Sequence, residues 1–538
     1  MADPQSPAST AYDVVSYTGR SYPQTHPDRM ATLATLYGLS PPPLAACRVL
    51  ELGCGDGANL LPVALALPGS TCVGIDLSAE AVARGRELAG EAGIGNVSLL
   101  HMDVTELPRD FGEFDYVIAH GLYSWVPPAV QERVLEICKA RLSPNGIAYV
   151  SYNAMPGCRI RQTTREMMRY HVAGIADPAE KVARARALVK TLAEARDEAD
   201  PWGRVLRWEL EHVGAAEAGP IFHDDLAEVN EPLYFHEFAA RAVRHGLQFL
   251  SEAQFTDSLL GRPGEEPPPG PGAKAHRAFV AMTRGVAADD VVAREQYADF
   301  LRGRKFRQTL LCHAGVDVKR PAVAGRVESL YALAALRPES AEPDVRSNRP
   351  EKFTYDEGVP IQATQPVPKA ALVELSRRWP MPVAFDELLA ATGRRLGAGG
   401  VGGDGLRRTL ATFLFYCYSN SVLELRSHAP PVAAEAGPRP AASALARAQA
   451  KRGPIVTDLL GGHVRLDTPL TTKVLELCDG TRDRDALVRE LSVSVLAGKA
   501  AMQKDGRPVT DPAEVAALLR QGVESSLKAL AKLALLAA

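Results

Sequence analysis

Short apolar runs that stop at glycine, aspartate or histidine recur through the first 150 residues of the chain. They lie at 49–52, 72–76, 99–104, 114–121 and 142–152. Stretches of helical periodicity separate them. Apolar runs of this length, each followed by a helical segment, predict buried parallel strands in a doubly wound sheet. The carboxyl ends of such strands form the usual ligand-binding edge.

The pattern changes after residue 160. Residues 163–213 carry apolar side chains on one helical face and charged side chains on the other, which predicts a helical insertion. A helix is predicted at 232–246 and ends at a glycine. Two further apolar runs, at 247–255 and 277–284, are predicted to close the sheet as an antiparallel pair.

The last third of the chain predicts smaller, mostly helical units. The polar stretch 337–352 is predicted to be a domain linker. Helical patterns at 368–379, 384–396 and 405–421, followed by an extended run at 422–426, have the order of a winged helix. A terminal apolar helix is predicted at 513–537. The expected units are an N-terminal lid segment (1–44), a core (45–160), a helical insertion (161–220), a region with the closing strands (221–336), a winged-helix-like unit (353–428) and a C-terminal helical or winged-helix-like unit (442–538).

Composition narrows the class of protein. With 538 residues, 46% of them hydrophobic and 23% charged, the chain predicts a globular protein of several domains. A net charge of −3 provides no basic field for nucleic acid. The chain has neither a signal-peptide pattern nor an apolar run of membrane-spanning length, so we expect a cytoplasmic protein without membrane insertion. Eight cysteines without a C-x-x-C pair predict reduced thiols and no metal site.

The loop after the first strand carries the strongest chemical signal. It places Glu51 before glycines at 53, 55 and 57, so a ligand is expected to lie against bare backbone. A carboxylate at this position would repel a phosphate but would suit a cationic ligand. Asp76, at the end of the second strand, lies where a carboxylate accepts hydrogen bonds from ribose hydroxyls. The ligand is therefore predicted to carry a ribose and a positive charge.

This loop resembles the first motif of class I S-adenosylmethionine (SAM) methyltransferases. The resemblance implies SAM as cofactor and a Rossmann-like seven-stranded sheet with mostly α winged-helix-like domains after it. It places the methionine part of SAM at the glycine loop, the ribose at Asp76 and the adenine at Met102 and Asp103. Cys54 is expected to pack without chemistry. The full set of expected cofactor residues is Glu51, Gly53, Cys54, Gly55, Gly57, Asp76, Leu77, Met102, Asp103 and His120.

Longer strings are more specific. YPQTHPDR at 22–29, HGLYSWVP at 120–127, SYNAMPG at 151–157, FHDDLAEVNEPLYFHEF at 222–238 and REQYADFLRGRKFRQTLLC at 294–312 are similar to bacterial protein-lysine methyltransferases typified by rickettsial enzymes acting on outer membrane proteins. The resemblance implies a methyltransferase regulatory domain within 221–336 and a lysine-bearing protein substrate. A small-molecule methyltransferase and a SAM-binding regulatory protein without turnover remain alternatives.

Candidates for the acceptor site follow the fourth and fifth strands. They are His120, Tyr123, Trp125, Tyr152 and Asn153, with Tyr17, Tyr22 and His26 on the lid segment. Packing alone is the alternative for the aromatic residues, and a structural hydrogen bond is the alternative for His120. A run of acids and histidines (Glu209, His212, His223, Asp224 and Asp225) imitates a metal site, but its spacing is not diagnostic, so no metal is expected.

The region after residue 355 keeps large apolar helix faces, for example at Leu406, Leu410 and Phe413. Such faces predict docking of a partner protein or of a second copy of the chain, giving a homodimer. Truncation near residue 350 is therefore expected to leave SAM binding intact and to reduce methylation of the protein target.

Overall fold

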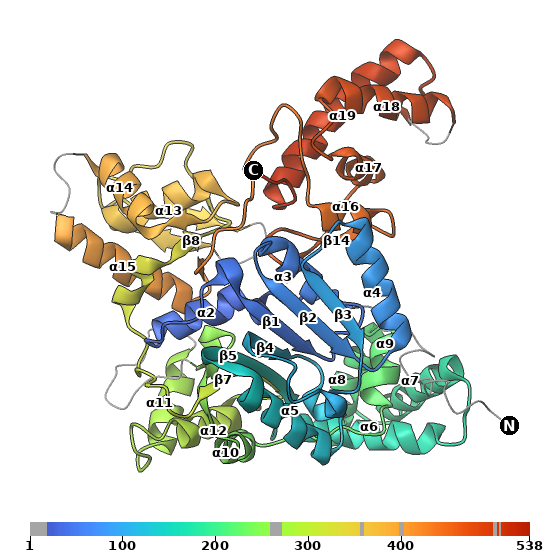
Figure 1. Cartoon of the computed structure of the whole chain (residues 1–538), viewed down its shortest axis with the longest axis vertical. Coiled ribbons are helices and arrows are strands. Elements are labelled where there is room, and N and C mark those ends of the chain that lie inside the picture. Colours follow the sequence, from blue (N-terminus) through green and yellow to red (C-terminus); the bar gives the residue numbers. More distant parts are fainter. Residues whose placement is uncertain (1–18, 259–271, 356–359, 398–402, 499–502, 505–506) are drawn as a thin grey trace.

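The computed structural model describes residues 19–258, 272–355, 360–397, 403–498, 503–504 and 507–538. A seven-stranded sheet lies at the centre, with helices on both of its faces (Figure 1). Two smaller lobes, one around α13–α15 and one around α16–α19, lie above the sheet at the left and right of this view. The helical insertion lies at the lower right.

The central sheet has the strand order β3-β2-β1-β4-β5-β7-β6. Six strands run parallel, and β7 is antiparallel to both of its neighbours, β5 and β6. The bounds are β1 Arg48–Leu52, β2 Thr71–Asp76, β3 Val97–His101, β4 Phe114–Ala119, β5 Leu142–Asn153, β6 Leu247–Glu252 and β7 Phe306–His313. This order and the reversed β7 confirm the predicted class I methyltransferase sheet. The chain order reverses between β1 and β4, where a doubly wound sheet opens a crevice for its ligand.

Alternating side chains build a core on each face of the sheet. Val49 and Cys72 belong to the core on one face, and the neighbouring Leu50 belongs to the core on the other. The first face is covered by α2 (Pro27–Leu36), α3 (Leu60–Ala66) and α4 (Ala79–Glu91). The second face is covered by α5 (Pro128–Arg141) and α10 (Phe235–Arg244). Both faces are buried, which explains the nearly continuous apolar runs of these strands.

The seventh strand corrects the sequence prediction. Residues 277–284 were expected to form it but lie mainly in a helix, α11 (Gly272–Met282), where Thr283 Oγ1 donates to the carbonyl of Phe279 one turn earlier. The strand is instead β7, which lies beyond α12 (Val291–Arg302). β7 did not stand out because it contains Arg307, a fully buried cation that pairs with Glu252 at 2.7 Å and with Asp299 at 2.9 Å. The sequence of β7 is therefore less apolar than is usual for a buried strand.

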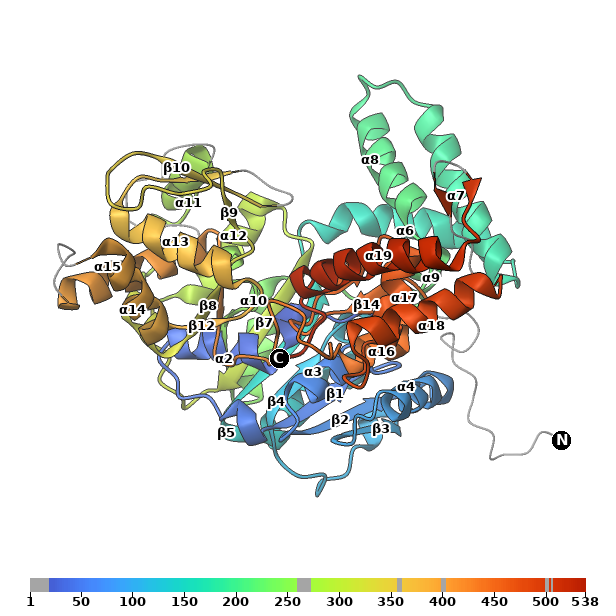
Figure 2. The same ribbon diagram turned by 90° about the horizontal axis from the view of Figure 1, so that it is seen from above.

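The helical insertion consists of α6 (Cys158–Val172), α7 (Pro178–Glu194) and α8 (Pro201–Ala215), followed by α9 (Ala218–Pro220). It has an apolar core of its own, which includes Met168, Val182, Val189 and Val213. Figure 2 shows α7 and α8 projecting away from the central sheet. One π-helical turn, η5 (Ile221–Asp225), follows α9 and returns the chain to the sheet.

The stretch 337–352, predicted as a linker, is part of a folded lobe. Before it, β8 (Tyr331–Leu333) pairs with β12 (Val383–Ala384) and β13 (Glu424–Arg426). Within it, β9 (Arg337–Pro338) pairs with β10 (Glu351–Thr354), which in turn pairs with β11 (Ile361–Ala363). The buried ammonium of Lys369 holds the intervening loop by donating to the carbonyls of Asp344, Ser347 and Arg349 at 2.5–2.8 Å. The stretch 337–352 is therefore folded around the ammonium of Lys369 from α13 and is not an independent spacer.

Helices complete both lobes. The first contains α13 (Pro366–Arg378), α14 (Phe385–Leu396) and α15 (Gly403–Ser419) around one apolar core. The second contains α16 (Ala444–Ala450), the β14–β15 hairpin (Ile455–Thr457, His463–Arg465), α17 (Pro469–Leu477), α18 (Arg484–Leu496) and α19 (Pro512–Lys532). The last helix ends at Lys532, earlier than predicted, because the residues after it pair in extended conformation: the N–H of Ala433 donates to the carbonyl of Leu536, and the N–H of Ala537 donates to the carbonyl of Ala441.

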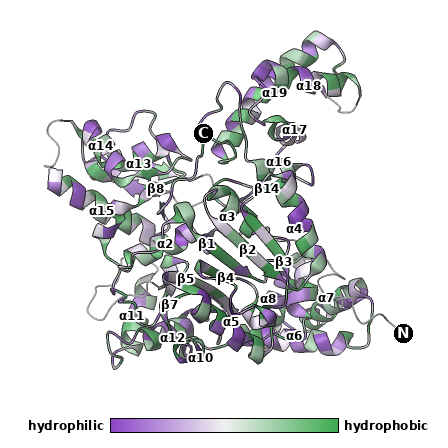
Figure 3. Cartoon of the chain, in the orientation of Figure 1, coloured by the Kyte–Doolittle hydropathy of each residue, from purple (hydrophilic) through white to green (hydrophobic). Residues whose placement is uncertain are grey.

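The hydropathy of the surface agrees with this arrangement. Figure 3 shows hydrophilic positions along the peripheral helices α4 and α6. Among the helices that the structure describes, none combines the length and apolar character needed to cross a membrane.

Candidate active site

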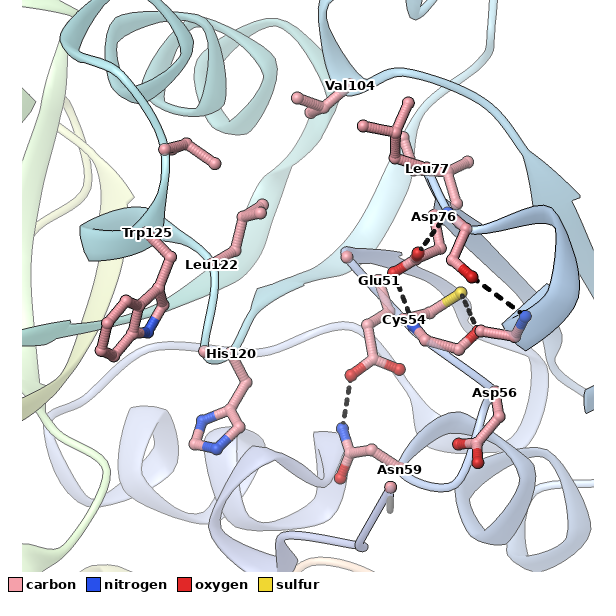
Figure 4. Close-up of a pocket in the computed structure, with 18 of the residues that line it drawn as sticks. Glu51, Cys54, Asp56, Asn59, Asp76, Leu77, Val104, His120, Leu122 and Trp125 are labelled. Atoms are coloured by element: carbon pink, nitrogen blue, oxygen red, sulfur yellow. Dashed lines mark hydrogen bonds between the residues drawn. The ribbon is translucent and has the colours of Figure 1, made fainter. Parts of the chain in front are cut away.

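A cavity of about 830 Å³ lies at the carboxyl ends of β1, β2 and β4 (Figure 4). Its walls come from the glycine-rich loop after β1, the loops after β2, β3 and β4, and the segment that precedes α2. The predicted site residues that line it are Glu51, Gly53, Cys54, Gly55, Asp76, Leu77, Met102, Asp103, His120, Trp125 and Asn153. The structure therefore gathers most of the predicted site around one space.

The three loop glycines differ in what surrounds them. All three have positive φ angles, of 73°, 54° and 73° at Gly53, Gly55 and Gly57. A Cβ added to Gly55 would meet nothing within 4 Å, because this residue faces the cavity. At Gly57 it would lie 2.9 Å from Leu99, so this glycine serves the packing of the loop. Gly57 was predicted to border the cofactor, but it is absent from the cavity lining that the described residues form.

Glu51 supplies a buried carboxylate at the cavity wall. Its Oε1 accepts a hydrogen bond from Asn59 Nδ2 at 2.7 Å, while its Oε2 is buried without a hydrogen-bond partner in the described structure. Burial raises the pKa of Glu51 to about 8, and the nearby carboxylates of Asp76 and Asp56 act in the same direction. An unpartnered carboxylate oxygen in an acidic cavity suits a cationic ligand. The sulfonium and ammonium groups of SAM fit this wall.

Asp76 organises the cofactor loops. Its Oδ2 accepts from the backbone N–H of Gly55 at 2.7 Å, and its Oδ1 accepts from Ser78 N–H at 2.8 Å. The carboxylate thus joins the glycine loop to the start of α4. Each carboxylate oxygen has a second lone pair, so these contacts leave acceptor capacity for ribose hydroxyls.

The far end of the cavity is apolar. Leu77, Met102 and Val104 line it after β2 and β3, and Leu77 is 54% exposed. Asp103 also lines the cavity, but its Oδ1 caps the short helix η3 (Val104–Glu106) by accepting from Thr105 N–H at 2.7 Å. An exposed leucine beside a methionine suits a planar ring such as adenine. Burial holds the pKa of the Cys54 thiol well above its usual value, so Cys54 is an unreactive wall residue.

His120 marks the opposite end of the cavity. Its Nδ1 lies 2.9 Å from the hydroxyl of Tyr149, and its ring packs against Tyr22 in a tilted arrangement with a centroid distance of 3.9 Å. Burial lowers the pKa of His120 to about 4, so the imidazole is neutral at physiological pH. Phe306, at the start of β7, lies edge-on to the same ring at 6.2 Å.

Two predicted acceptor residues lie elsewhere. Tyr123 and Tyr152 are fully buried in the core between β5 and α10, where Tyr152 stacks on Phe238 at 4.2 Å. Neither belongs to the cavity lining formed by the described residues. The structure thus places both tyrosines in the apolar core, where packing accounts for them, and their role at the acceptor site stays a prediction from the sequence. Trp125 and Asn153 do line the cavity, and Asn153 Nδ2 donates to Asn230 at 3.0 Å.

Of the residues predicted on the lid segment, some line the cavity and others do not. Tyr22 lines the cavity, whereas His26 is buried and caps α2 by accepting from Asp28 N–H at 3.1 Å. Tyr17 lies outside the described residues. The lid is tied to both C-terminal lobes: Ser21 Oγ donates to the carbonyl of Gly461 at 2.8 Å, and Asp28 accepts from Arg426 and from the backbone of Ser427 and His428.

Several cavity residues were missed by the sequence reasoning. Asn59, Phe306 and Gln308 gave no local signal, because they reach the cavity only through tertiary packing. Asp224 was noticed only as part of a metal-like cluster. In the structure Arg161 occupies that cluster and pairs with Glu209 and Asp225, both at 2.6 Å. Within the described residues, no group of three or more histidine, cysteine or acidic side chains could hold a metal ion.

Comparison with known proteins identifies the parts of the chain. The family model "Methyltransferase domain" matches residues 49–146. "Predicted methyltransferase regulatory domain" matches 218–267 and 274–313, and "PKMT, C-terminal winged helix domain" matches 438–535. The three models therefore cover the sheet, its closing strands and the C-terminal lobe.

Relatives extend this similarity over most of the chain. An uncharacterized protein of Rickettsia prowazekii is 32% identical over 391 residues, which is 72% of this chain and 68% of that protein. A second one is 35% identical over 241 residues, covering 45% of this chain and 96% of the relative. The structure of PKMT2 from Rickettsia typhi in complex with AdoHcy superposes with a TM-score of 0.84 and 29% identity, over 97% of this chain and 99% of that one.

The fold and the site define a class I methyltransferase whose cofactor is S-adenosylmethionine. The chain belongs to the family of bacterial methyltransferases that join this domain to a methyltransferase regulatory domain and a PKMT-type C-terminal winged-helix domain, and that includes these rickettsial proteins.

Proposed function

We propose that the protein transfers a methyl group from SAM to the side-chain nitrogen of lysine in a protein substrate. The observation that carries this proposal is the full-length agreement with the structure named PKMT2, with a TM-score of 0.84 over 97% of the chain. Relatives named for small-molecule methylation, such as aklanonic acid methyltransferase and ubiquinone biosynthesis O-methyltransferase, align with only 16% and 20% of the chain. These two alignments cover 89 and 109 residues, about the length of the cofactor-binding domain alone.

The cofactor residues are assigned roles from their surroundings. Glu51 Oε2 faces the positive charge of the methionine part, and Gly53 and Gly55 leave room for it beside bare backbone. Asp76 accepts hydrogen bonds from the ribose with the lone pairs that remain on its carboxylate. Leu77, Met102 and Val104 hold the adenine ring. Asp103 acts on the adenine site indirectly: it caps the first turn of η3 and so fixes the position of that helix.

The bound cofactor supplies a methyl group attached to a positively charged sulfur. The protein then has to align a nitrogen nucleophile opposite the carbon–sulfur bond, at about 3–3.5 Å from the methyl carbon. It also has to present that nitrogen without a proton, because lysine has a reference pKa near 10.4. Desolvation favours the neutral amine, since burial disfavours the charged form.

The end of the cavity around His120 is the proposed acceptor site. Tyr22, Trp125 and Phe306 supply aromatic surface for an alkyl stem, and Asn153 supplies polar groups beside it. His120 was predicted as a possible base. With a pKa of about 4 it takes up protons poorly at neutral pH, so we assign it a positioning role, held by Tyr149 at 2.9 Å.

The large part of the chain outside the catalytic sheet offers surface on which a protein substrate could bind. Both C-terminal lobes contact the lid of the cavity, so a substrate bound to them would meet the acceptor end directly. A homodimer through the C-terminal region and a cytoplasmic location stay predictions from the sequence.

Incubation of the full chain with methyl-labelled SAM and a total extract of the native cells tests the proposal. Label is expected in protein bands, and methyllysine is expected after acid hydrolysis. Label in the organic extract would favour a small-molecule acceptor, and tight SAM binding without transfer would favour a regulatory protein. A Gly55→Val chain, whose added side chain enters the cavity, serves as the control without bound cofactor.

A further inference from the structure

Asp224 brings a carboxylate from the regulatory region to the cofactor cavity. It lies in η5, the single π-helical turn Ile221–Asp225, and it is one of the residues that line the cavity. The adjacent Asp225 is committed elsewhere, since its Oδ2 accepts from Arg161 at 2.6 Å. Single π-helical turns occur often at functional sites, where they alter the direction of neighbouring side chains. Here one of two consecutive acids is neutralised and the other lines the cavity.

The charges around η5 do not balance. Arg161 bridges Glu209 and Asp225, both at 2.6 Å, so one guanidinium serves two carboxylates before Asp224 is counted. Arg165 donates to the main-chain carbonyl of Asp224 at 3.3 Å and not to its carboxylate. Within the described part of the chain, no side chain donates a hydrogen bond to the Asp224 carboxylate. Among the described residues, the Asp224 carboxylate therefore has no side-chain hydrogen-bond donor of its own, although Arg20 and Arg84 line the same cavity.

A second acceptor lies in the same cavity. Gln308 Oε1 is buried without a hydrogen-bond partner in the described structure, and the residue lines the cavity from β7. Phe306 stands two residues earlier on the same face of the strand. Two acceptors beside an aromatic ring favour a ligand that brings N–H donors, a positive charge and an alkyl stem. A primary ammonium on an unbranched chain has all three.

We propose that Asp224 binds the ammonium group of the methyl-accepting lysine and takes one of its protons before methyl transfer. This inference rests on the proposed function. An N–H bond of the ammonium breaks, its proton moves to a carboxylate oxygen and its electron pair stays on nitrogen. That pair then forms the new nitrogen–carbon bond while the carbon–sulfur bond breaks towards sulfur. Asp224 returns the proton to solvent after the product leaves.

The protonation chemistry of this end of the cavity suits the role. Burial and the negative charge of Asp225 raise the pKa of Asp224 to about 7, while Arg161 acts in the opposite direction. A base whose pKa lies near the working pH transfers protons efficiently. Among the described residues, the charged or titratable groups around this turn include Asp225 on η5, Arg161 and Arg165 from α6, and Glu209 and His212 from α8. Tyr22 and Arg20 approach it from the lid.

The test compares Asp224→Asn with Glu228→Gln in the full chain. Glu228 is an exposed acid four residues further on, so it controls for a lost negative charge near η5. The acceptor is a synthetic peptide with a single lysine, and AdoHcy affinity is measured by calorimetry. We expect Asp224→Asn to lower kcat/KM for the peptide by about 100-fold or more. We expect AdoHcy affinity to stay within twofold, and the pH profile of kcat/KM to lose its rise near pH 7.

Three results separate this inference from the proposed function. If the wild-type chain methylates the peptide and Asp224→Asn matches it in rate and pH profile, the assignment of Asp224 is overturned and the proposed function stands. If Asp224→Asn loses AdoHcy affinity as strongly as activity, Asp224 belongs to the cofactor site and the inference also fails. If the wild-type chain methylates no lysine, the proposed function fails. Binding of Nα-acetyl-lysine amide to the AdoHcy complex then decides: weaker binding in Asp224→Asn supports amine recognition, and equal binding overturns it.

Discussion

Asn59 donates its side-chain amide to Glu51 across 2.7 Å, and its Oδ1 accepts from the backbone N–H of Tyr22 at 2.8 Å. One side chain therefore connects the buried acid of the cofactor wall to the lid over the cavity. Thr25 Oγ1 adds a third contact to the same Oδ1 at 3.0 Å. A shift of the lid would therefore act on the carboxylate that we propose faces the positive charge of the cofactor.

Replacing Asn59 with leucine should weaken both binding and stability. We expect AdoHcy affinity to fall at least tenfold, and the free energy of unfolding to fall by about 1–3 kcal/mol because buried hydrogen bonds are lost. Titration calorimetry and denaturant unfolding measure the two effects. Asn96→Leu is the matched control, since Asn96 donates to the carbonyls of Ala64 and Leu67 away from the cavity. An equal loss of affinity in both variants would contradict the coupling.

SAM binding should release a proton from Glu51. With a pKa of about 8, Glu51 is mostly protonated at pH 7 in the free protein, whereas the carboxylate is the form that stabilises a cation. We expect a release approaching one proton per SAM at pH 7, and an affinity that rises with pH until about pH 8. Calorimetry in buffers of different ionisation enthalpy counts the protons. Glu51→Gln should remove the buffer dependence; an unchanged dependence would assign the proton to another group.

His26 should make the protein sensitive to acid. Burial lowers its pKa in the folded state to about 4, below its unfolded value near 6.5. The unfolded chain therefore binds the proton first, and stability falls as the pH drops from about 6.5 to 4. The largest loss expected from this residue is about 3 kcal/mol. Denaturant unfolding of wild type and His26→Asn at several pH values measures the contribution of His26 to this loss of stability. Asparagine is chosen because it preserves the helix cap. Parallel pH dependences would contradict the assignment.

Asp76→Ala should weaken SAM binding more than folding. The variant loses the acceptor for the ribose and the contacts to Gly55 and Ser78, and hydrogen bonds to a charged group are each worth about 1.5–3 kcal/mol. Titration calorimetry on a variant with wild-type circular dichroism gives the result. Unchanged affinity in that folded variant would show that the ribose lies elsewhere.

Loss of the lid anchor should disturb the cofactor site from a distance. The sequence predicts that removal of the region after residue 350 leaves SAM binding intact. The contacts of Asp28 with Arg426 and Ser427 favour the opposite outcome, because they connect that region to the lid. Arg426→Ala in the full chain leaves the buried Asp28 carboxylate without its ion-pair partner, although its hydrogen bonds from Ser427 and His428 remain, so we expect a cost of at most about 3–5 kcal/mol. Hydrogen exchange should rise in residues 20–36, and AdoHcy affinity should fall.

Arg452→Ala is the control for that experiment. It breaks a bidentate pair with Glu91 at 2.8 and 2.9 Å on a partly exposed surface, where such pairs contribute at most about 1 kcal/mol. The exchange of residues 20–36 should not change. If both variants behave alike, the lid does not depend on its contact with the first lobe.

The sequence predicted those parts of the fold and site whose signal is local. The apolar runs and the glycine spacing located the sheet and the loop with Glu51 and Asp76. The seventh strand was missed because Arg307 interrupts its apolar pattern and is neutralised by Glu252 of β6 and Glu295 of α12, contacts that only the fold creates. Tyr123 and Tyr152 were predicted at the acceptor site because they lie near the carboxyl ends of strands. Side chains at such positions can face either the ligand site or the apolar core. Asn59, Asp224 and Gln308 reach the cavity only through tertiary packing, so no local pattern marks them.

The most direct test of the account is mass spectrometry of lysine in proteins exposed to the full chain and SAM with a deuterated methyl group. The extract of native cells provides the acceptors, and the Gly55→Val chain provides the control that binds no cofactor. The account predicts deuterated methyl groups on lysine side-chain nitrogens of one or a few proteins, present with wild type and absent with the control. Deuterium found only in small molecules, or only on residues other than lysine, would contradict it.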